Sequence, residues 1–306
     1  MVEVSVIVPF YNESESIDGF FSAIMPILKR LGLSFEILCI NDGSKDDTLE
    51  RLIGKKKRFP QLKIINFSRN FGKDAAITAG IDFADGNCAI PIDSDLQDPP
   101  DLIADMVAKW REGFDMVLAR RSDRSEDSCL KRITACMFYK TYNMLSDTEL
   151  PENVGDFRLL DRKVMDALKT FPERKRFMKG LFAFAGFKTT SIEYKRPERN
   201  MGTSKWSYWK LWSYAVDGIT SFSIFPLKIS IYLGIFVTFL AFARGLWIFF
   251  RTVLYGVDIP GYASTTVALL LLGGVQLMSL GVIGEYIGGI YNESKKRPIY
   301  IVRDVI

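Results

Sequence analysis

The chain of 306 residues contains no histidine at all. This absence excludes Ser-His-Asp and Cys-His catalysis, zinc held by histidine, and acid–base chemistry by imidazole. Cysteine is scarce and widely spaced: the four cysteines form no Cys-x-x-Cys pair, so neither a disulfide framework nor a structural zinc site is indicated. The formal charge of +4 is too small to suggest a nucleic-acid partner. The chemistry must therefore use carboxylates, cations, backbone groups or a metal ion.

What is present divides the chain into two parts. Up to about Lys205, short apolar and β-favouring runs alternate with helical or mixed segments, as expected for an α/β domain with a mostly parallel sheet covered by helices. The expected strands are Val4–Pro9, Phe35–Ile40, Lys63–Phe67, Cys88–Asp93 and Asp115–Ala119. In such sheets the ligand crevice lies beyond the carboxyl ends of the strands. We therefore expect the polar residues that follow these runs to converge on one site.

One of these strand ends carries an acidic run, IPIDSDLQDPPD, from Ile90 to Asp101. A solvated acidic loop before a helix is one interpretation. The other is a metal site, because the oxygens of Asp93, Asp95 and Gln97 are hard ligands suited to Mg²⁺ or Mn²⁺. The α/β half has neither a dinucleotide fingerprint nor a P-loop that would explain the run otherwise. A nucleoside diphosphate held through a divalent metal is the interpretation we favour.

The second part contains two long apolar stretches, Ile229–Phe250 and Thr265–Ile290. Each exceeds the roughly 20 residues that cross a bilayer core, although two buried core helices would show the same pattern. We expect a transmembrane hairpin over residues 227–292. Lysines and arginines flank its two ends, which places both ends and the α/β domain on the cytoplasmic side.

Tryptophans recur every three residues at the start of the segment 206–226, at Trp206, Trp209 and Trp212. They could belong to a core, but beside a membrane span an interfacial amphipathic helix is favoured. The tail, residues 293–306, ends in the β-branched run from Arg297 to Ile306. We expect a strand there that docks on a neighbouring catalytic domain in a homo-oligomer.

Six ordered motifs now make the chain recognisable. It resembles the family 2 inverting glycosyltransferases of GT-A fold, and among them the polyisoprenyl-phosphate glycosyltransferases. It looks closest to the bacterial bactoprenol glucosyltransferases and is related to the dolichol-phosphate mannosyltransferases. The motifs are Pro9-Phe10-Tyr11-Asn12-Glu13, Asn41-Asp42-Gly43-Ser44, Asn70-Phe71-Gly72-Lys73, Asp93-Ser94-Asp95-Leu96-Gln97-Asp98-Pro99-Pro100, Gly155-Asp156-Phe157-Arg158-Leu159 and Arg199-Asn200-Met201-Gly202-Thr203-Ser204-Lys205. Asn41 departs from the family, where many relatives carry Asp.

The resemblance implies residues 1–205 as a cytoplasmic GT-A domain and a role for each motif. The residues that hold the nucleoside of the donor would be Pro9, Tyr11, Asn12, Glu13 and Asp42. Asp93 would face its ribose or phosphate, and Asp95 with Gln97, beside Asp93, would bind Mg²⁺ or Mn²⁺.

Further motif residues would act on the phosphates. Arg199, Ser204 and Lys205 would close over the donor diphosphate or the acceptor phosphate. A second basic cluster suited to phosphate comprises Arg120, Arg121, Arg124, Lys131 and Arg132. Asp156 would orient the acceptor or take a proton, or else serve as an ion-paired structural residue. Lys73 is placed with the donor-binding set, although Lys73 and Arg158 could equally be structural.

The implied activity is transfer of a hexose, most readily glucose, from a UDP-sugar to polyprenyl (undecaprenyl) phosphate at the cytoplasmic face of the inner membrane. The absence of histidine fits this activity, since a lipid phosphate is a nucleophile without deprotonation. Two alternatives stay open. A processive polysaccharide synthase would share fold and spans, but its Gln-x-x-Arg-Trp motif does not occur here. A non-catalytic membrane scaffold or lipid carrier would not need the acidic set.

Overall fold

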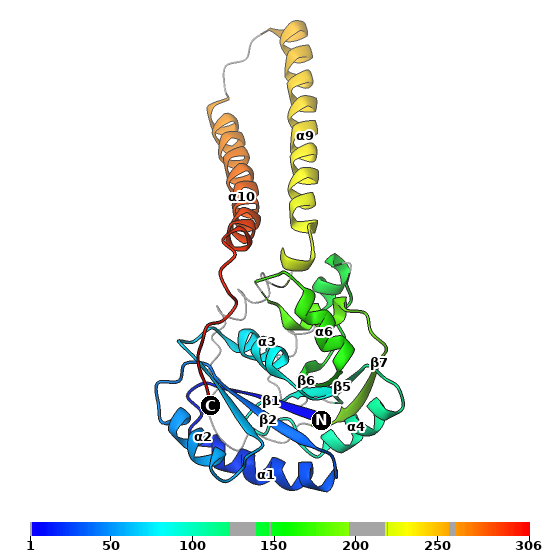
Figure 1. Cartoon of the computed structure of the whole chain (residues 1–306). Coiled ribbons are helices and arrows are strands. Elements are labelled where there is room, and N and C mark those ends of the chain that lie inside the picture. The colour runs from blue at the N-terminus through cyan, green and yellow to red at the C-terminus, as the bar shows by residue number, and fades with distance from the viewer. Residues whose placement is uncertain are drawn as a thin grey trace.

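The computed structural model describes residues 2–122, 139–146, 148–174, 176–195, 218, 220–256 and 261–306. Its centre is an eight-stranded sheet in the order β7-β5-β6-β4-β1-β2-β3-β8, with helices on both faces (Figure 1). All five strands expected from the sequence are present. They are β1 Val4–Phe10, β2 Phe35–Asn41, β3 Leu62–Phe67, β4 Cys88–Pro91 and β5 Met116–Arg121.

The sheet is mostly parallel, as the alternation of runs and helices predicted. β1 pairs in parallel with both β2 and β4, and β2 pairs in parallel with β3. Two further strands were not among the expected runs. β6, Val154–Asp161, lies antiparallel between β4 and β5, and β7, Thr189–Tyr194, runs parallel to β5 at the edge.

Helices cover each face of this sheet because each carries one apolar stripe. In α1, Ser16–Arg30, the buried residues Ile17, Phe20, Phe21, Ile24 and Leu28 recur at helical spacing. Together with α2, Thr48–Lys56, and α4, Leu102–Arg111, this helix covers one face. The opposite face, toward the two long helices in Figure 1, is covered by α3, Lys73–Phe83, α6, Arg162–Thr170, and α7, Met178–Phe184.

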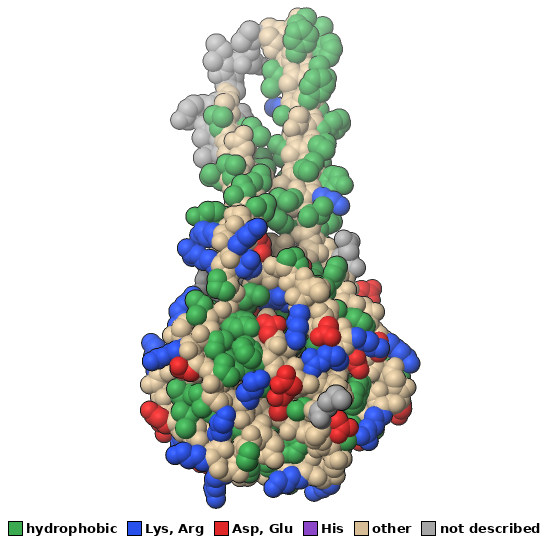
Figure 2. Space-filling model, viewed as in Figure 1, with side chains coloured by type: hydrophobic (Ala, Val, Ile, Leu, Met, Phe, Trp, Pro, Cys, Tyr) green, Lys and Arg blue, Asp and Glu red, His purple; other side chains and the backbone are tan. Residues whose placement is uncertain are grey.

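Two long helices rise from the catalytic part, α9 Phe225–Tyr255 and α10 Tyr262–Ser294 (Figure 1). Both are long and apolar enough to cross a membrane, and neither has any of its most apolar window buried. Figure 2 shows apolar side chains over the helices, whereas charged side chains gather over the catalytic part and at the base of the hairpin. Of the expected interfacial segment 206–226, only residue 218 and residues 220–226 lie inside the described residues.

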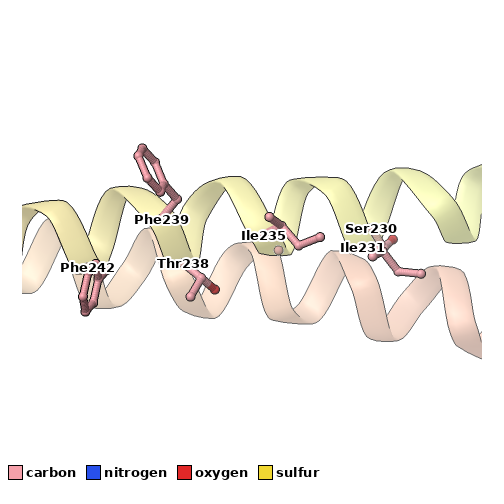
Figure 3. Close-up of a pocket in the computed structure, with 7 residues that line it drawn as sticks. Ser230, Ile231, Ile235, Thr238, Phe239 and Phe242 are labelled. Atoms are coloured by element: carbon pink, nitrogen blue, oxygen red, sulfur yellow. The ribbon is translucent and has the colours of Figure 1, made fainter.

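A shallow groove runs along the surface of α9 (Figure 3). Its volume is about 560 Å³, and its lining runs from Ser230 and Gly234 through Thr238 to Phe242. The lining surface is almost entirely apolar because only two hydroxyl side chains contribute to it. Such a surface suits contact with acyl or prenyl chains rather than with water.

The C-terminal tail corrects one expectation. A strand does form, β8 Val302–Val305, but it pairs antiparallel with β3 of its own chain. The expectation that it pairs with a neighbouring domain is therefore wrong for this structure. The Tyr300 ring stacks on Phe67 with centroids 5.1 Å apart, and its hydroxyl donates to Asp82 at 2.6 Å. Among the described strands, only β2 and β8 pair with β3, so β8 occupies what would otherwise be an open sheet edge. The tail therefore fastens the end of the hairpin to the sheet.

Candidate functional site

The loops after β1 and β2 are joined into one wall at the carboxyl edge of the sheet. The N–H of Asn12 donates to the Ser44 hydroxyl at 3.0 Å, and the N–H of Lys45 donates to the Asn12 side chain at 2.8 Å. Asn12 adopts a positive φ of 51°, which asparagine tolerates better than most residues. The N–H of Glu13 donates to Thr48 at 3.1 Å. Pro9 lies inside β1, one residue before its end, and Tyr11 is exposed just after the strand.

Asp42 lies directly after β2, buried, and fastens a third loop to this wall. Its carboxylate accepts from the N–H groups of Phe71 and Gly72 at 2.6 and 3.0 Å and from the Asn70 amide at 2.9 Å. Burial raises the pKa of the Asp42 carboxyl, and the two backbone donors partly offset that rise. In the structure Asp42 therefore orders the loop that leads into Lys73.

Gly43 shows why the two loops can lie so close. Its φ is +64°, and a Cβ at this position would lie 2.3 Å from the backbone carbon of Arg69 and 2.5 Å from the nitrogen of Asn70. Only glycine fits such an approach without moving the neighbouring backbone. The glycine of the Asn-Asp-Gly-Ser motif thus has a packing reason that the sequence alone did not reveal.

The centre of the site is a three-way ion pair. The ammonium of Lys73, the first residue of α3, lies 2.8 Å from both carboxylate oxygens of Asp93 and 2.7 Å from Asp156. Asp93 follows β4, and Asp156 belongs to β6. Three motifs separated by long stretches of chain therefore meet at one nitrogen atom.

The sheet register explains the meeting. In the antiparallel pair of β4 and β6, Cys88 lies opposite Asp161 and Ala89 opposite Leu160. Asp93 lies just beyond the end of β4, and counting this register onward sets it level with Asp156 of β6. Two carboxylates would then lie close together, and their repulsion is unfavourable unless a cation lies between them. Lys73 supplies that cation.

The shifts in the pKa values of Asp156 and Lys73 follow from this geometry. Burial alone would raise the pKa of the Asp156 carboxyl, but the charges of Lys73 and Lys179 outweigh it and hold the pKa far below its usual value. Burial alone would lower the pKa of Lys73, and the two carboxylates raise it well above its usual value instead. Asp156 is therefore an ionised carboxylate throughout the physiological pH range, and thus a weak base.

The acidic run turns at a residue with positive φ, and its side chains on either side of the turn contact different parts of the protein. Leu96 has a φ of +56°, and the Gln97 N–H donates to the Asp95 carboxylate at 3.1 Å. Asp98 faces elsewhere: it accepts from the hydroxyl of Tyr194 at the end of β7, to which Arg121 donates at 3.4 Å. Burial, followed by the charge of Asp98, raises the pKa of Tyr194 to about 12.

Among the described residues, no group of three or more acidic, cysteine or histidine side chains could hold a metal ion by itself. Both oxygens of Asp93 contact Lys73, and the other oxygen-bearing side chains expected to hold a metal are those of Asp95 and Gln97. Mg²⁺ commonly takes one or two protein carboxylates and completes its shell with substrate phosphates and water. The donor set thus fits a metal that arrives together with a diphosphate.

Three charged residues beside Asp156 complete the described site. Arg158 is buried with its guanidinium 4.1 Å from the Phe182 ring centroid, and burial lowers its pKa to about 10 although Asp156 opposes this. Lys179 and Asp74 were not expected from the sequence. Burial and then the charge of Asp156 raise the pKa of Asp74 to about 7. Its position next to Lys73 is the one signal that could have identified it, whereas an isolated lysine such as Lys179 carries none.

Some expected residues lie apart from this cluster. Arg120 is exposed at the end of β5. The remaining expected phosphate-binding residues lie outside the described residues: Arg124, Lys131, Arg132, Arg199, Ser204 and Lys205.

The mostly parallel sheet, the acidic edge bridged by Lys73 and the two helices of membrane-spanning length agree with a glycosyltransferase of GT-A fold, and comparison with known proteins shows this class. The chain belongs to glycosyl transferase family 2, whose model matches residues 5–169, and a model of the GtrB C-terminal hairpin matches residues 225–290. The family resemblance inferred from the motifs is confirmed.

Full-length relatives agree with this assignment. The chain is 51% identical over 304 residues to an uncharacterized glycosyltransferase of Synechocystis sp., covering 99% of this chain and 96% of that one. It is 47% identical over 303 residues to the bactoprenol glucosyl transferase of Shigella phage SfV, covering 99% of each chain. A prophage bactoprenol glucosyl transferase homolog of Escherichia coli is 47% identical over 304 residues, with 99% of each chain covered.

Proposed function

We propose that the protein transfers one glucose from a UDP-sugar to polyprenyl phosphate at the cytoplasmic face of the inner membrane, with inversion at the anomeric carbon. The observation that carries this proposal is the site formed by Lys73, Asp93 and Asp156, which lies in a family 2 catalytic domain joined to two membrane-length helices. The names of the bactoprenol glucosyl transferases, similar over their full length, support glucose and a prenyl acceptor.

The donor would occupy the wall formed by the loops after β1 and β2. Its nucleoside would contact Tyr11 and the loop held by Asn12 and Asp42, and its diphosphate would lie near Asp95 and Gln97. A divalent ion bound there would stabilise the charge that develops on the leaving nucleoside diphosphate. Asp95 and Gln97 are the side chains that would hold it, with oxygens of the diphosphate.

The acceptor phosphate would attack from the side of Asp156. It carries about −1.5 to −2 charge near neutral pH, so one of its oxygens can form the new bond to the anomeric carbon while the bond to the diphosphate breaks, with no proton removed. Attack opposite the leaving group inverts the carbon. Asp156, fully ionised beside Lys73, would position the reactants rather than accept a proton.

The two helices would cross the inner membrane with the catalytic part in the cytoplasm. Lys295, Lys296 and Arg297 follow α10 and would remain on the cytoplasmic side, as the positive-inside tendency requires. We also keep the homo-oligomer as part of the proposal, now through the exposed apolar faces of α9 and α10 rather than through β8. Its mass in detergent, compared with that of the single chain, tests it.

One assay tests the proposed reaction. The purified protein receives labelled UDP-glucose, Mg²⁺ and either polyprenyl phosphate or an oligosaccharide, and the product is analysed by mass and anomeric configuration. The expected product is one β-linked glucose per lipid phosphate. A sugar polymer, an α-linked product from the α-linked donor, or equal use of both acceptors would contradict the proposal.

A further inference from the structure

Two cations near Asp156 have no partner in the ion-pair network around Lys73. Within the part of the chain that the structure describes, Lys179 and Arg158 make no ion pair, although both contribute to the electrostatic field that keeps Asp156 ionised. Lys73, in contrast, is committed to two carboxylates. Lys179 can therefore approach an incoming anion, while the buried Arg158 adds positive charge behind it.

The burial of Arg158 also indicates positive charge that no carboxylate balances directly. Only 3% of it is exposed, and its Nε–H is buried without a hydrogen-bond acceptor, while one terminal nitrogen donates to the Gly155 carbonyl at 2.6 Å. A buried guanidinium without a carboxylate is costly unless an anion or water completes its hydrogen bonds. Arginine with a second cation beside it is the arrangement that binds phosphate oxygens well.

Both cations line one small cavity. Its volume is about 10 Å³, which admits about one oxygen-sized atom. The remaining lining is formed by Tyr139 and the largely apolar residues Leu150, Pro151 and Val154. One side of the cavity therefore offers positive charge, and the rest offers hydrocarbon surface. A phosphate attached to an apolar chain has the same two-sided chemistry.

The helices α3, α6 and α7 cover the face of the sheet that is turned toward the long helices (Figure 1). Lys179 belongs to α7, and the next residue, Gly180, leaves room for Phe222, since a Cβ there would lie 2.5 Å from the Phe222 ring. Ser223 then leads into α9, and the Tyr286 hydroxyl of α10 donates to the Ser223 carbonyl at 2.5 Å. Lys179 thus lies in the part of the catalytic domain that joins the membrane hairpin.

We propose that Lys179, supported by Arg158, binds the phosphate monoester of a membrane lipid on the hairpin side of Asp156. This inference rests on the proposed function, which it deepens by naming the residues that receive the acceptor phosphate. Lys179 contacts a phosphate oxygen directly, and Arg158 supplies the fixed positive charge behind it. The cavity has room for about one oxygen-sized atom, so it takes one phosphate oxygen while the rest of the lipid phosphate lies outside it.

The test compares binding of three probes to the full chain in detergent micelles: a short-chain polyprenyl phosphate, the polyprenol of equal length and inorganic phosphate. The proteins are wild type, Lys179→Gln, Lys179→Arg and the control Lys169→Gln, which removes an exposed lysine of α6. Wild type and the control should prefer the lipid phosphate over the alcohol by about tenfold or more, as expected for a charge-assisted contact. Lys179→Gln should lose most of this preference, and Lys179→Arg should keep it.

The outcomes separate the two proposals. If Lys179→Gln keeps the wild-type preference, the inference is wrong and the proposed function stands. If wild type itself does not distinguish the phosphate from the alcohol, the proposed acceptor is wrong and the inference falls with it. Inorganic phosphate bound as tightly as the lipid phosphate would assign the site to a free anion and overturn the lipid assignment. Thermal unfolding shows whether Lys179→Gln is folded. If it is not, Lys179→Met is tested in its place, provided that it unfolds like wild type. Loss of the preference for the lipid phosphate in Lys179→Met then supports the inference, and an unchanged preference contradicts it.

Discussion

Replacing Lys73 by methionine should destabilise the catalytic domain in a pH-dependent way. The methionine keeps much of the volume of the side chain but removes the charge that separates Asp93 from Asp156. Loss of one partner from a buried ion pair costs about 3–5 kcal/mol. The side chains of Lys73, Asp93 and Asp156 are 38%, 37% and 17% exposed, so solvent screening reduces the expected cost to about 2 kcal/mol.

The sign of the pH effect follows from the pKa shifts. In wild type, the depressed pKa of Asp156 contributes stability above about pH 4 that is lost as the pH falls. The raised pKa of Lys73 contributes stability that is lost only above about pH 10. In the variant, the two carboxylates repel one another, and a proton bound by either relieves that repulsion. The stability difference between wild type and variant should therefore shrink as the pH falls.

The assay is thermal unfolding of the full chain in detergent at about pH 8 and about pH 5. We expect the Lys73→Met midpoint to lie about 4–8 °C below wild type at the higher pH and less than half as far below at the lower pH. Lys109→Met is the matched control, because it breaks an exposed pair with Glu112 that is worth less than about 1 kcal/mol. Equal differences at both pH values would refute the reasoning from the shared carboxylates.

Three further predictions test other parts of the site. Turnover should vanish with a chelator and return with Mg²⁺ or Mn²⁺, and Asp95→Asn should abolish it, whereas full turnover in excess chelator would exclude a metal. Gly43→Ala should cost about 2–4 kcal/mol in unfolding experiments and weaken UDP binding, since its Cβ would meet backbone at 2.3 Å. Gly54→Ala in α2 meets nothing within 4 Å and should be neutral or stabilising, so equal losses in both variants would contradict the steric argument. Tyr300→Phe keeps the ring stack but loses the hydrogen bond to Asp82, and amide hydrogen exchange of β8 should rise several-fold; unchanged exchange would show that this bond does not hold the tail.

Much of the fold was predictable because its signals are local. Short apolar runs predicted β1 to β5, since a strand buried on both faces needs apolar residues whichever strands lie beside it. The β6 segment was quoted as the motif from Gly155 to Leu159 but not predicted as a strand, because its charged Asp156 and Arg158 interrupt the apolar pattern. Those charges are tolerated because the Lys73 ammonium pairs with Asp156 and the Phe182 ring packs against the Arg158 guanidinium.

The sequence by itself determined which chemistry is present: no imidazole, an acidic run after a strand, and two apolar stretches long enough for a bilayer. These features can be predicted from the sequence because they depend either on composition or on residues close together in the chain. Only the tertiary structure decided which of these residues meet. The Lys73 ammonium joins Asp93 to Asp156, the edge of β3 pairs with β8, and Lys179 lies beside the site because α7 packs against the entrance to the hairpin. Such contacts join residues far apart in sequence, and no local pattern encodes them.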